Sequence, residues 1–240
     1  MARMLIVGLD GLNPELIRDW LDDLPNLKRM QQEGIWGEIE STIPPHPVPA
    51  WVSAQSSRNP GAFGFWSLRY RDEFYYDLPK VADCTIKEKR VEPLYKILAR
   101  FGQKVAVISL PTTWPPPKIP GGYSVSCYMT PQEDTNFTWP TSFKDEIEKV
   151  VGKYIIDLQA KDYLQMNRQK LLNDIHIMDS QRCALLKYLI SKKQCDFVWL
   201  VLTGPDRIGH FCLNKTSVDK ELLHEYYSWL DAQIGEVCAA

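Results

Sequence analysis

Three short apolar runs constrain the fold more than any other feature of this sequence. They lie at Met4–Leu9, Lys104–Leu110 and Phe197–Leu202, and each is rich in β-branched or aromatic residues. Runs of this length that are apolar almost throughout are typical of strands buried in a parallel sheet. Stretches of helical periodicity alternate with them, at 13–33, 91–101, 142–151, 163–192 and 218–237. The alternation predicts an α/β fold, with a mostly parallel sheet and helices on both faces.

Length and composition place the chain among ordinary globular proteins. It has 240 residues, of which 45% are hydrophobic and 24% charged. The net charge of −2 gives no electrostatic basis for coating nucleic acid. No apolar run approaches the roughly 20 residues that span a bilayer. Since no repeat or composition shift divides the chain, we predict a single domain over residues 1–240, with neither nucleic acid nor membrane as a partner.

The N-terminus and the cysteines bear on the cellular compartment. The first residues run straight into the first apolar segment, without the charged region, apolar core and cleavage site of a signal peptide. The cysteines show no CxxC pair and no regular spacing, so no disulfide framework is expected; they lie at positions 84, 127, 183, 195, 212 and 238. These features predict a cytoplasmic protein.

Helix caps and proline-rich segments punctuate the pattern. Asn13 and Pro14 suit the start of a helix, and Gly34 suits its end. Residues 43–66 and 111–140 are dense in proline and aromatic residues, and each follows a strand-like segment. Because α/β sheets bind ligands just beyond their strands, we expect both segments to be ordered loops near a ligand site.

Asp10 is the first candidate site residue. It directly follows the first apolar run and precedes Gly11, which allows a ligand or a neighbouring segment to approach closely. A carboxylate at the end of a strand suits metal or phosphate chemistry, and an Asx turn at a strand–helix junction is the alternative. The segment lacks the later glycine of a G-x-G-x-x-G turn, which argues against a dinucleotide site.

Asp206 and His210 form the second candidate cluster, shortly after the third apolar run. If a helical turn begins near Pro205, the i,i+4 spacing places the carboxylate and the imidazole on one face. Oxygen and nitrogen ligands of this kind suit zinc or manganese. The alternative is a capping aspartate and an unrelated surface histidine. His46, in the first proline-rich segment, is a weaker candidate.

A series of motifs resembles the alkaline phosphatase superfamily, in particular its phosphohydrolase/phosphomutase branch near the type I phosphodiesterases/nucleotide pyrophosphatases. The resemblance runs in order along essentially the whole chain. Its motifs are GLDG at 8–11, PNL at 25–27, EGIWGEIEST at 33–42, IPP…PAW at 43–51, NPGAFGF at 59–65, PTTWPPP at 111–117 and PDRIGHF at 205–211.

The resemblance implies an alkaline-phosphatase-like fold and a two-metal phosphoester hydrolase that uses zinc or manganese, acts on a small phosphoester and attacks with a Thr or Ser nucleophile. It implies Asp10 as the metal ligand after the first strand. Asp206 and His210 match the Asp and His that serve the other metal.

Two departures from the family pattern lead us to expect an impaired site. Pro47 occupies the nucleophile position in His46-Pro47-Val48-Pro49-Ala50-Trp51, so no catalytic residue is assigned. The resemblance also implies a further strand with an Asp-His-Gly motif, and a later histidine, after a helix like 218–237, whereas this sequence ends at Ala240. We therefore expect the C-terminal part of the family fold to be missing, leaving a sheet edge open to self-association. One alternative is a catalytically inactive, truncated relative that acts as a binding module or has no retained role. Another is that His46 acts as nucleophile or ligand in place of the lost hydroxyl.

Overall fold

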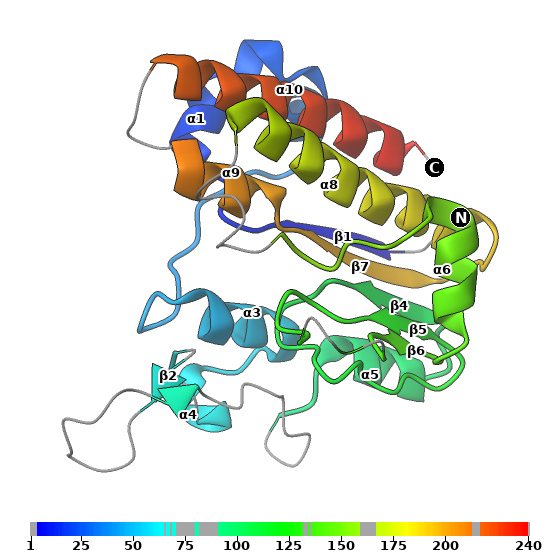
Figure 1. The fold of residues 1–240 in the computed structure, drawn as a ribbon. Coiled ribbons are helices and arrows are strands. Elements are labelled where there is room, and N and C mark those ends of the chain that lie inside the picture. The colour runs from blue at the N-terminus through cyan, green and yellow to red at the C-terminus, as the bar shows by residue number, and fades with distance from the viewer. Residues whose placement is uncertain are drawn as a thin grey trace. The chain divides into compact units, whose positions relative to one another are not determined.

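The computed structural model describes residues 4–64, 66–67, 69–70, 80–81, 91–131, 134, 136–158, 167–212 and 217–239. The chain forms two compact units, one of Met1–Gly37 with Asp145–Ala240 and the other of Glu38–Lys144. We call them unit 1 and unit 2, and Figure 1 shows their elements. That 1–240 is a single domain stays a prediction.

Unit 1 is built on two parallel strands, β1 (Met4–Leu9) and β7 (Phe197–Leu202). Their register pairs Met4 with Phe197 and Leu9 with Leu202, so the two strands end side by side. Every residue of β7 is buried, as expected for an apolar run without alternation. Both strands are confirmed with the predicted bounds. Among the described residues of unit 1, β1 pairs with no strand other than β7.

The helices of unit 1 follow the predicted periodicity with one difference. The stretch 13–33 is divided into α1 (Pro14–Asp19), the 3₁₀ turn η1 (Leu21–Asp23) and α2 (Pro25–Glu33). The last division falls at Pro25, the first residue of α2, which lacks the N–H that an unbroken helix would need there. The predicted cap is confirmed, because the Asn13 side chain accepts hydrogen bonds from the backbone of the first turn.

Four further helices complete the described part of unit 1. They are α6 (Phe143–Val151), which begins at the unit boundary, α8 (Arg168–Ser191), α9 (Gly204–Cys212) and α10 (Ser217–Cys238). The long helices α8 and α10 lie side by side (Figure 1), and α8 also packs against β7. Their buried faces supply much of the core of this unit.

Unit 2 contains a small mixed sheet. β4 (Val105–Ile108) runs parallel to β5 (Tyr123–Val125), and β6 (Thr138–Trp139) runs antiparallel to β5. The predicted strand at 104–110 is confirmed but shorter, because Ser109 takes a left-handed conformation with φ 56°. The second proline-rich segment, which was predicted to be a loop, contains the two short strands β5 and β6.

The first proline-rich segment of unit 2 is partly helical, contrary to its prediction as a loop. It holds α3 (Pro47–Ser56) and α4 (Pro60–Phe63), each with a proline at its first position. Proline fits there because its fixed φ suits a helix and its missing N–H has no partner to lose. The unit also contains α5 (Leu94–Arg100) and the strand pair β2 (Arg69–Tyr70) and β3 (Lys80–Val81).

Two further expectations concern the chain as a whole. Within the described ranges, no helix has the length and apolar character needed to cross a membrane. Cys84 lies outside the described residues, and none of the other five cysteines takes part in a disulfide.

Candidate functional site

The carboxyl ends of β1 and β7 bring two candidate residues together. The backbone N–H of Asp10 donates to the carbonyl of Leu202 over 3.0 Å, which extends the pairing of the strands by one residue. Gly11 follows with φ +69°, and a Cβ at this position would lie 2.7 Å from the Cα of Asp206. The tight contact requires a glycine, because any larger residue would collide with the Asp206 backbone. Asp10 and Asp206 thus lie at one edge of the strand pair, where α/β proteins bind ligands.

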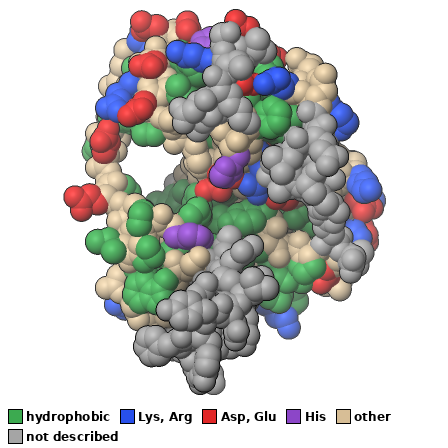
Figure 2. All heavy atoms as spheres, turned by 60° about the vertical axis from the view of Figure 1, so that its left-hand side comes forward, with side chains coloured by type: hydrophobic (Ala, Val, Ile, Leu, Met, Phe, Trp, Pro, Cys, Tyr) green, Lys and Arg blue, Asp and Glu red, His purple; other side chains and the backbone are tan. Residues whose placement is uncertain are grey.

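The predicted helical turn after β7 is confirmed. Asp206 lies in the first turn of α9 and His210 in its last. His210 Nε2 lies 3.3 Å from Asp206 Oδ1, as the i,i+4 spacing predicts. The His210 side chain is 70% exposed, and Figure 2 shows histidine side chains reaching the surface on the face that it draws. The pair is therefore accessible to a ligand, and its role in metal binding stays a prediction.

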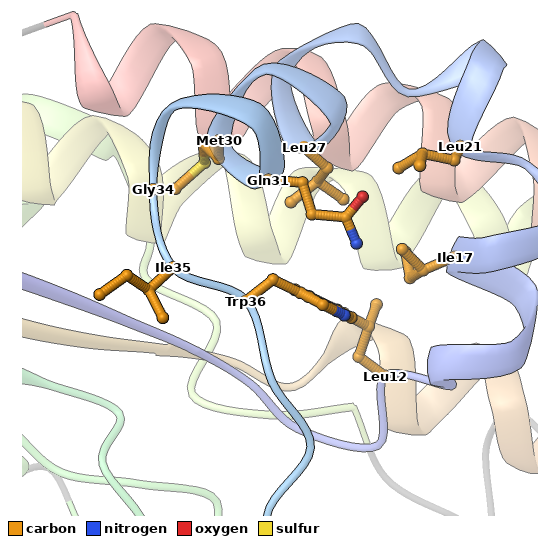
Figure 3. A pocket seen from close by; sticks show the side chains of 9 residues that line it. All are labelled: Leu12, Ile17, Leu21, Leu27, Met30, Gln31, Gly34, Ile35 and Trp36. Carbon is orange, nitrogen blue, oxygen red and sulfur yellow. The ribbon is translucent and has the colours of Figure 1, made fainter.

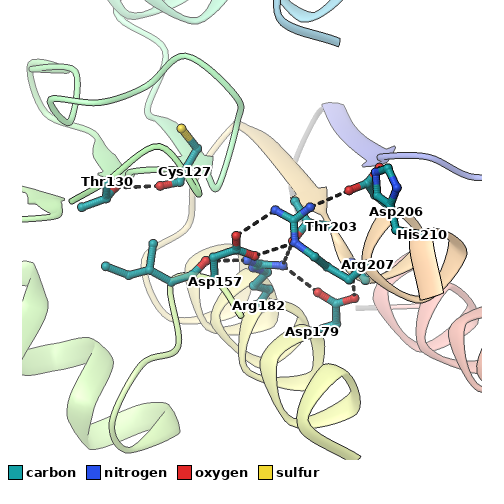
Figure 4. A network of polar contacts seen from close by, with 11 residues as sticks. Cys127, Thr130, Asp157, Asp179, Arg182, Thr203, Asp206, Arg207 and His210 are labelled. Carbon is teal, nitrogen blue, oxygen red and sulfur yellow. Dashed lines mark hydrogen bonds and ion pairs between the residues drawn. The ribbon is translucent and has the colours of Figure 1, made fainter. Parts of the chain in front are cut away.

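Arg207 holds the Asp206 carboxylate from the side opposite His210. Its guanidinium pairs with Asp206 Oδ2 through Nη1. It also forms a bidentate ion pair with Asp157, in which Nε lies 3.0 Å from Oδ1 and Nη2 lies 2.7 Å from Oδ2. Such paired hydrogen bonds fix the plane of the guanidinium as well as its position. Figure 4 shows this arrangement, in which Asp206 is oriented by a residue that is itself anchored.

A fully buried cluster lies behind the turn that leads into α9. Arg182 and Asp179, both on α8, form an ion pair with neither side chain exposed, and Nη1 lies 2.7 Å from Oδ1. Asp179 Oδ2 also accepts from the Tyr226 hydroxyl at 2.7 Å and from the Gly204 N–H at 3.1 Å. Burial raises the pKa of Tyr226 well above its usual value, so its hydroxyl remains a proton donor to Asp179.

Sequence reasoning missed this buried cluster. Asp179 and Arg182 lie within a helical pattern in which charged residues usually face solvent. Their partners are distant in sequence, since Gly204 lies 25 positions and Tyr226 lies 47 positions from Asp179. The one sequence feature that hints at the cluster is the glycine at position 204. A Cβ at that residue would overlap Asp179 Oδ2 and the Tyr226 hydroxyl.

Pro47 occupies the first position of α3, in unit 2. His46 is the N-cap residue, and its Nδ1 accepts a hydrogen bond from the Val48 N–H at 3.3 Å. His46 Nε2 lies 3.5 Å from Ser67 Oγ. The position that would carry a nucleophile therefore lies at the start of a helix, and its side chain has no hydroxyl. His46 serves a capping role there that the sequence analysis missed.

The donor atoms of Asp10, Asp206 and His210 fit a divalent metal in kind. Carboxylate oxygens and an imidazole nitrogen are ordinary ligands of zinc and manganese. In the part of the chain that the structure describes, however, no group of three or more His, Cys, Asp or Glu residues is placed to hold an ion. The described residues therefore show no closed metal site, and the role of these three residues as ligands stays a prediction.

An apolar pocket of about 310 Å³ also lies in unit 1 (Figure 3). Its first lining residue along the chain is Leu12, two residues after Asp10. Apart from the Trp36 indole, Gln31 is the one lining side chain that carries strong hydrogen-bonding groups. Ile35, which closes one side, is fully exposed, and Trp36 is half exposed. The sequence did not predict this pocket. Its walls come from helices and from an extended segment, and no local sequence pattern shows that these elements pack together. It is lined by Leu12, Ile17, Leu21, Leu27, Met30, Gln31, Gly34, Ile35 and Trp36.

The fold is that of an α/β protein with an alkaline-phosphatase-like, mostly parallel mixed sheet. The model of the type I phosphodiesterase / nucleotide pyrophosphatase family matches residues 4–240. The chain belongs to this family, and the predicted membership of the alkaline phosphatase superfamily is confirmed. Among curated protein sequences, none matches the chain.

Solved structures give the same fold at low identity. Phosphonoacetate hydrolase from Sinorhizobium meliloti, in complex with phosphonoacetate, is 16% identical with a TM-score of 0.61. An inactive form of murine ectonucleotide pyrophosphatase / phosphodiesterase 5, in complex with AMP, is 12% identical with a TM-score of 0.54. The matches cover 99% of this chain, but 53% and 51% of those chains. The chain thus spans about half the length of these structures.

Proposed function

We propose that the protein is a metal-dependent phosphoester hydrolase whose turnover is impaired, because position 47 lacks a nucleophile and the candidate ligands are fewer than a two-metal site needs. Asp10, Asp206 and His210 are its ligands to zinc or manganese, and its substrate is a small phosphoester. One observation carries the proposal: Asp10 and the Asp206–His210 pair lie together at the carboxyl edge of β1 and β7. Family membership and a neighbour solved with AMP, a phosphoester, support the substrate class, and a neighbour solved with phosphonoacetate shows that this fold also accommodates a phosphonate.

The residues of this chain have distinct parts in such a site. Asp206 and His210 present an oxygen and a nitrogen on one helix face, and Arg207 orients the Asp206 carboxylate. A bound divalent ion would neutralise the charge on a phosphoryl group and lower the pKa of a bound water. Pro47 supplies neither a nucleophile nor a backbone donor, so the covalent step that the family resemblance implies is unavailable at this position.

A hydrolysis assay tests the proposal. The purified chain is incubated with Zn²⁺ or Mn²⁺ and either p-nitrophenyl phosphate or its phosphodiester analogue. We expect slow, metal-dependent turnover that Asp206→Ala abolishes. Asp174→Ala is the matched control, because Asp174 pairs with Lys170 on the surface of α8, away from the candidate ligands. Turnover no higher than that of Asp206→Ala would refute hydrolase activity for this chain.

The second candidate function is a phosphoester-binding module without turnover. Pro47 favours it, because the first position of α3 holds no attacking group. Calorimetric titration of AMP in the presence of Mn²⁺ separates the two functions. Binding that depends on Asp206, without release of phosphate or adenosine, supports the module, whereas the same binding with product release supports the hydrolase.

Self-association is a further property that we propose for the isolated chain. Within the described residues, β1 has one strand neighbour, and Met4 at its start is 54% exposed. An apolar strand with an unpaired edge is prone to pair with another chain. Light scattering at increasing concentration is expected to show oligomers, and a monodisperse monomer would contradict the proposal.

A further inference from the structure

We propose that Asp179, Arg182 and Tyr226 are positioning residues that set the geometry of the candidate ligands Asp206 and His210. This inference rests on the proposed metal site and deepens it, because it concerns the support of the ligands rather than the ligands themselves. The three side chains come from α8 and α10, and all are buried. None of them contacts Asp206 directly in the interactions that the structure gives.

The first line of support runs through the turn between β7 and α9. Asp179 Oδ2 accepts from the Gly204 N–H at 3.1 Å, and Arg182 Nη1 donates to Thr203 Oγ1 at 2.8 Å. Thr203 and Gly204 are the two residues through which the chain leaves β7 and enters α9. Fixing both of them sets the direction of the first turn of α9, which carries Asp206.

The second line of support runs through Arg207. Arg182 Nη2 donates to the carbonyl of Ile156 at 2.8 Å. The next residue, Asp157, accepts hydrogen bonds from the Arg207 guanidinium with both carboxylate oxygens, and Arg207 pairs with Asp206. Arg182 therefore binds both the Thr203 hydroxyl, at the entry to α9, and the backbone carbonyl next to Asp157, which anchors the ion-pair partner of Asp206 (Figure 4).

The energetics favour a positioning role over a purely stabilising one. Removing two charges from water costs several kcal/mol per ion, and well-packed apolar residues often replace a buried ion pair without loss of stability. The hydrogen bonds of Asp179 and Arg182, in contrast, have fixed directions, which apolar side chains cannot reproduce. Supporting hydrogen bonds of this kind commonly change metal affinity by about 10- to 100-fold when they are removed.

The double variant Asp179→Leu/Arg182→Met tests the inference by removing both charges together. We expect it to fold with a melting temperature near that of the unaltered chain, and to bind Mn²⁺ at least about tenfold more weakly in an electron paramagnetic resonance titration. Lys187→Met/Glu236→Gln is the matched control, since it removes an exposed ion pair between the same two helices. Its Mn²⁺ affinity is expected to be unchanged.

A measurement without metal separates this inference from the proposed function. Nitrogen NMR of the His210 imidazole reports whether Nε2 carries the proton that it shares with Asp206 Oδ1. We expect the Nε2–H tautomer to be enriched in the unaltered chain and depleted in the double variant. If the unaltered chain binds no Mn²⁺, the proposed function fails and the tautomer alone decides the positioning role.

Tyr226→Phe keeps the inference testable if the double variant fails to fold. It removes one hydrogen bond to Asp179 and changes no charge, so a smaller shift in the same direction is expected in both measurements. A folded variant of either kind with unchanged Mn²⁺ affinity and an unchanged His210 tautomer would overturn the inference.

Discussion

The first turns of α9 and α3 differ in what supports them and in what they present. Behind the first turn of α9 lies the buried ion pair of Asp179 and Arg182, and the turn presents Asp206 with His210 one turn later. The first turn of α3 is capped locally by His46 and presents Pro47. The comparison teaches that a helix start can be well formed at both places while only one of them carries side chains suited to the chemistry.

Breaking the buried ion pair of the α9 region is expected to have the largest effect. Arg182→Met leaves the Asp179 carboxylate buried beside Tyr226 without its positive partner. Loss of one member of a buried pair costs about 3–5 kcal/mol, so the free energy of unfolding is expected to fall by that amount in urea titrations. The double variant Asp179→Leu/Arg182→Met is the control, and it is expected to recover most of the loss. An unfolding free energy unchanged in Arg182→Met would contradict the importance of the pair.

The next effect concerns the contact between Gly11 and Asp206. Gly11→Ala combines a left-handed backbone with a Cβ that would lie 2.7 Å from the Asp206 Cα. Gly102→Ala isolates the effect of the left-handed backbone, because Gly102 has φ +79° and no other segment of the described chain comes within 4 Å of the position that a Cβ would take. We expect a loss of about 1 kcal/mol for Gly102→Ala and a clearly larger one, about 2–3 kcal/mol, for Gly11→Ala.

Thermal unfolding of the two glycine variants measures this difference. In addition, Gly11→Ala is expected to weaken Mn²⁺ binding, since relief of the collision moves Asp10 and Asp206 apart, while Gly102→Ala leaves binding unchanged. Equal losses of stability in the two variants would contradict the close contact between Gly11 and the Asp206 backbone.

The α3 region is tested by Pro47→Thr. A threonine at the first helical position restores a hydroxyl but loses the preorganised φ of proline, at a cost of about 0.5–1 kcal/mol in unfolding free energy. We expect no gain in p-nitrophenyl phosphate turnover, because Asp10, Asp206 and His210 supply fewer ligands than a two-metal site needs. A metal-dependent gain that Asp206→Ala removes would show instead that the hydroxyl was the missing part.

The extent to which sequence predicted the molecule differs between the same two regions. β1 and β7 were predicted to the residue, because a buried parallel strand is apolar throughout and leaves a local signal. The Asp206–His210 pair was predicted because one helical turn is also local. The helical start at Pro47 differs from the predicted loop, since proline marks turns and first helical positions alike.

The support of Asp206 could not be predicted from any single segment. The hydrogen bond between Tyr226 and Asp179 spans 47 positions, and that between Arg207 and Asp157 spans 50. Such partners are chosen by how α8, α10 and the segment before α8 pack, which depends on tertiary structure. A candidate ligand can thus be visible in a sequence while the residues that contact and orient its side chain are not.

The smallest expected effect lies at the border of the buried cluster. His176 packs against Tyr226 and Trp229, with ring centroids 5.7 and 4.5 Å away, and its Nε2 is buried without a hydrogen-bond partner among the described residues. Burial lowers the pKa of His176 below its usual 6.5, with Glu225 and Asp179 opposing the shift. The unfolded chain therefore takes up the proton more readily than the folded one.

The sign of the pH dependence follows from that difference in proton uptake. The stability associated with neutral His176 is complete above pH 6.5 and is lost as the pH falls through the lowered pKa of the folded state. His176→Phe keeps the ring packing and removes the proton site, so its melting temperature is expected to fall less than that of the unaltered chain between about pH 7 and 5. His224→Phe is the matched control, because His224 lies on the surface beside Asp23. Parallel pH profiles for the unaltered chain and His176→Phe would place the pH sensitivity of this region elsewhere than at His176.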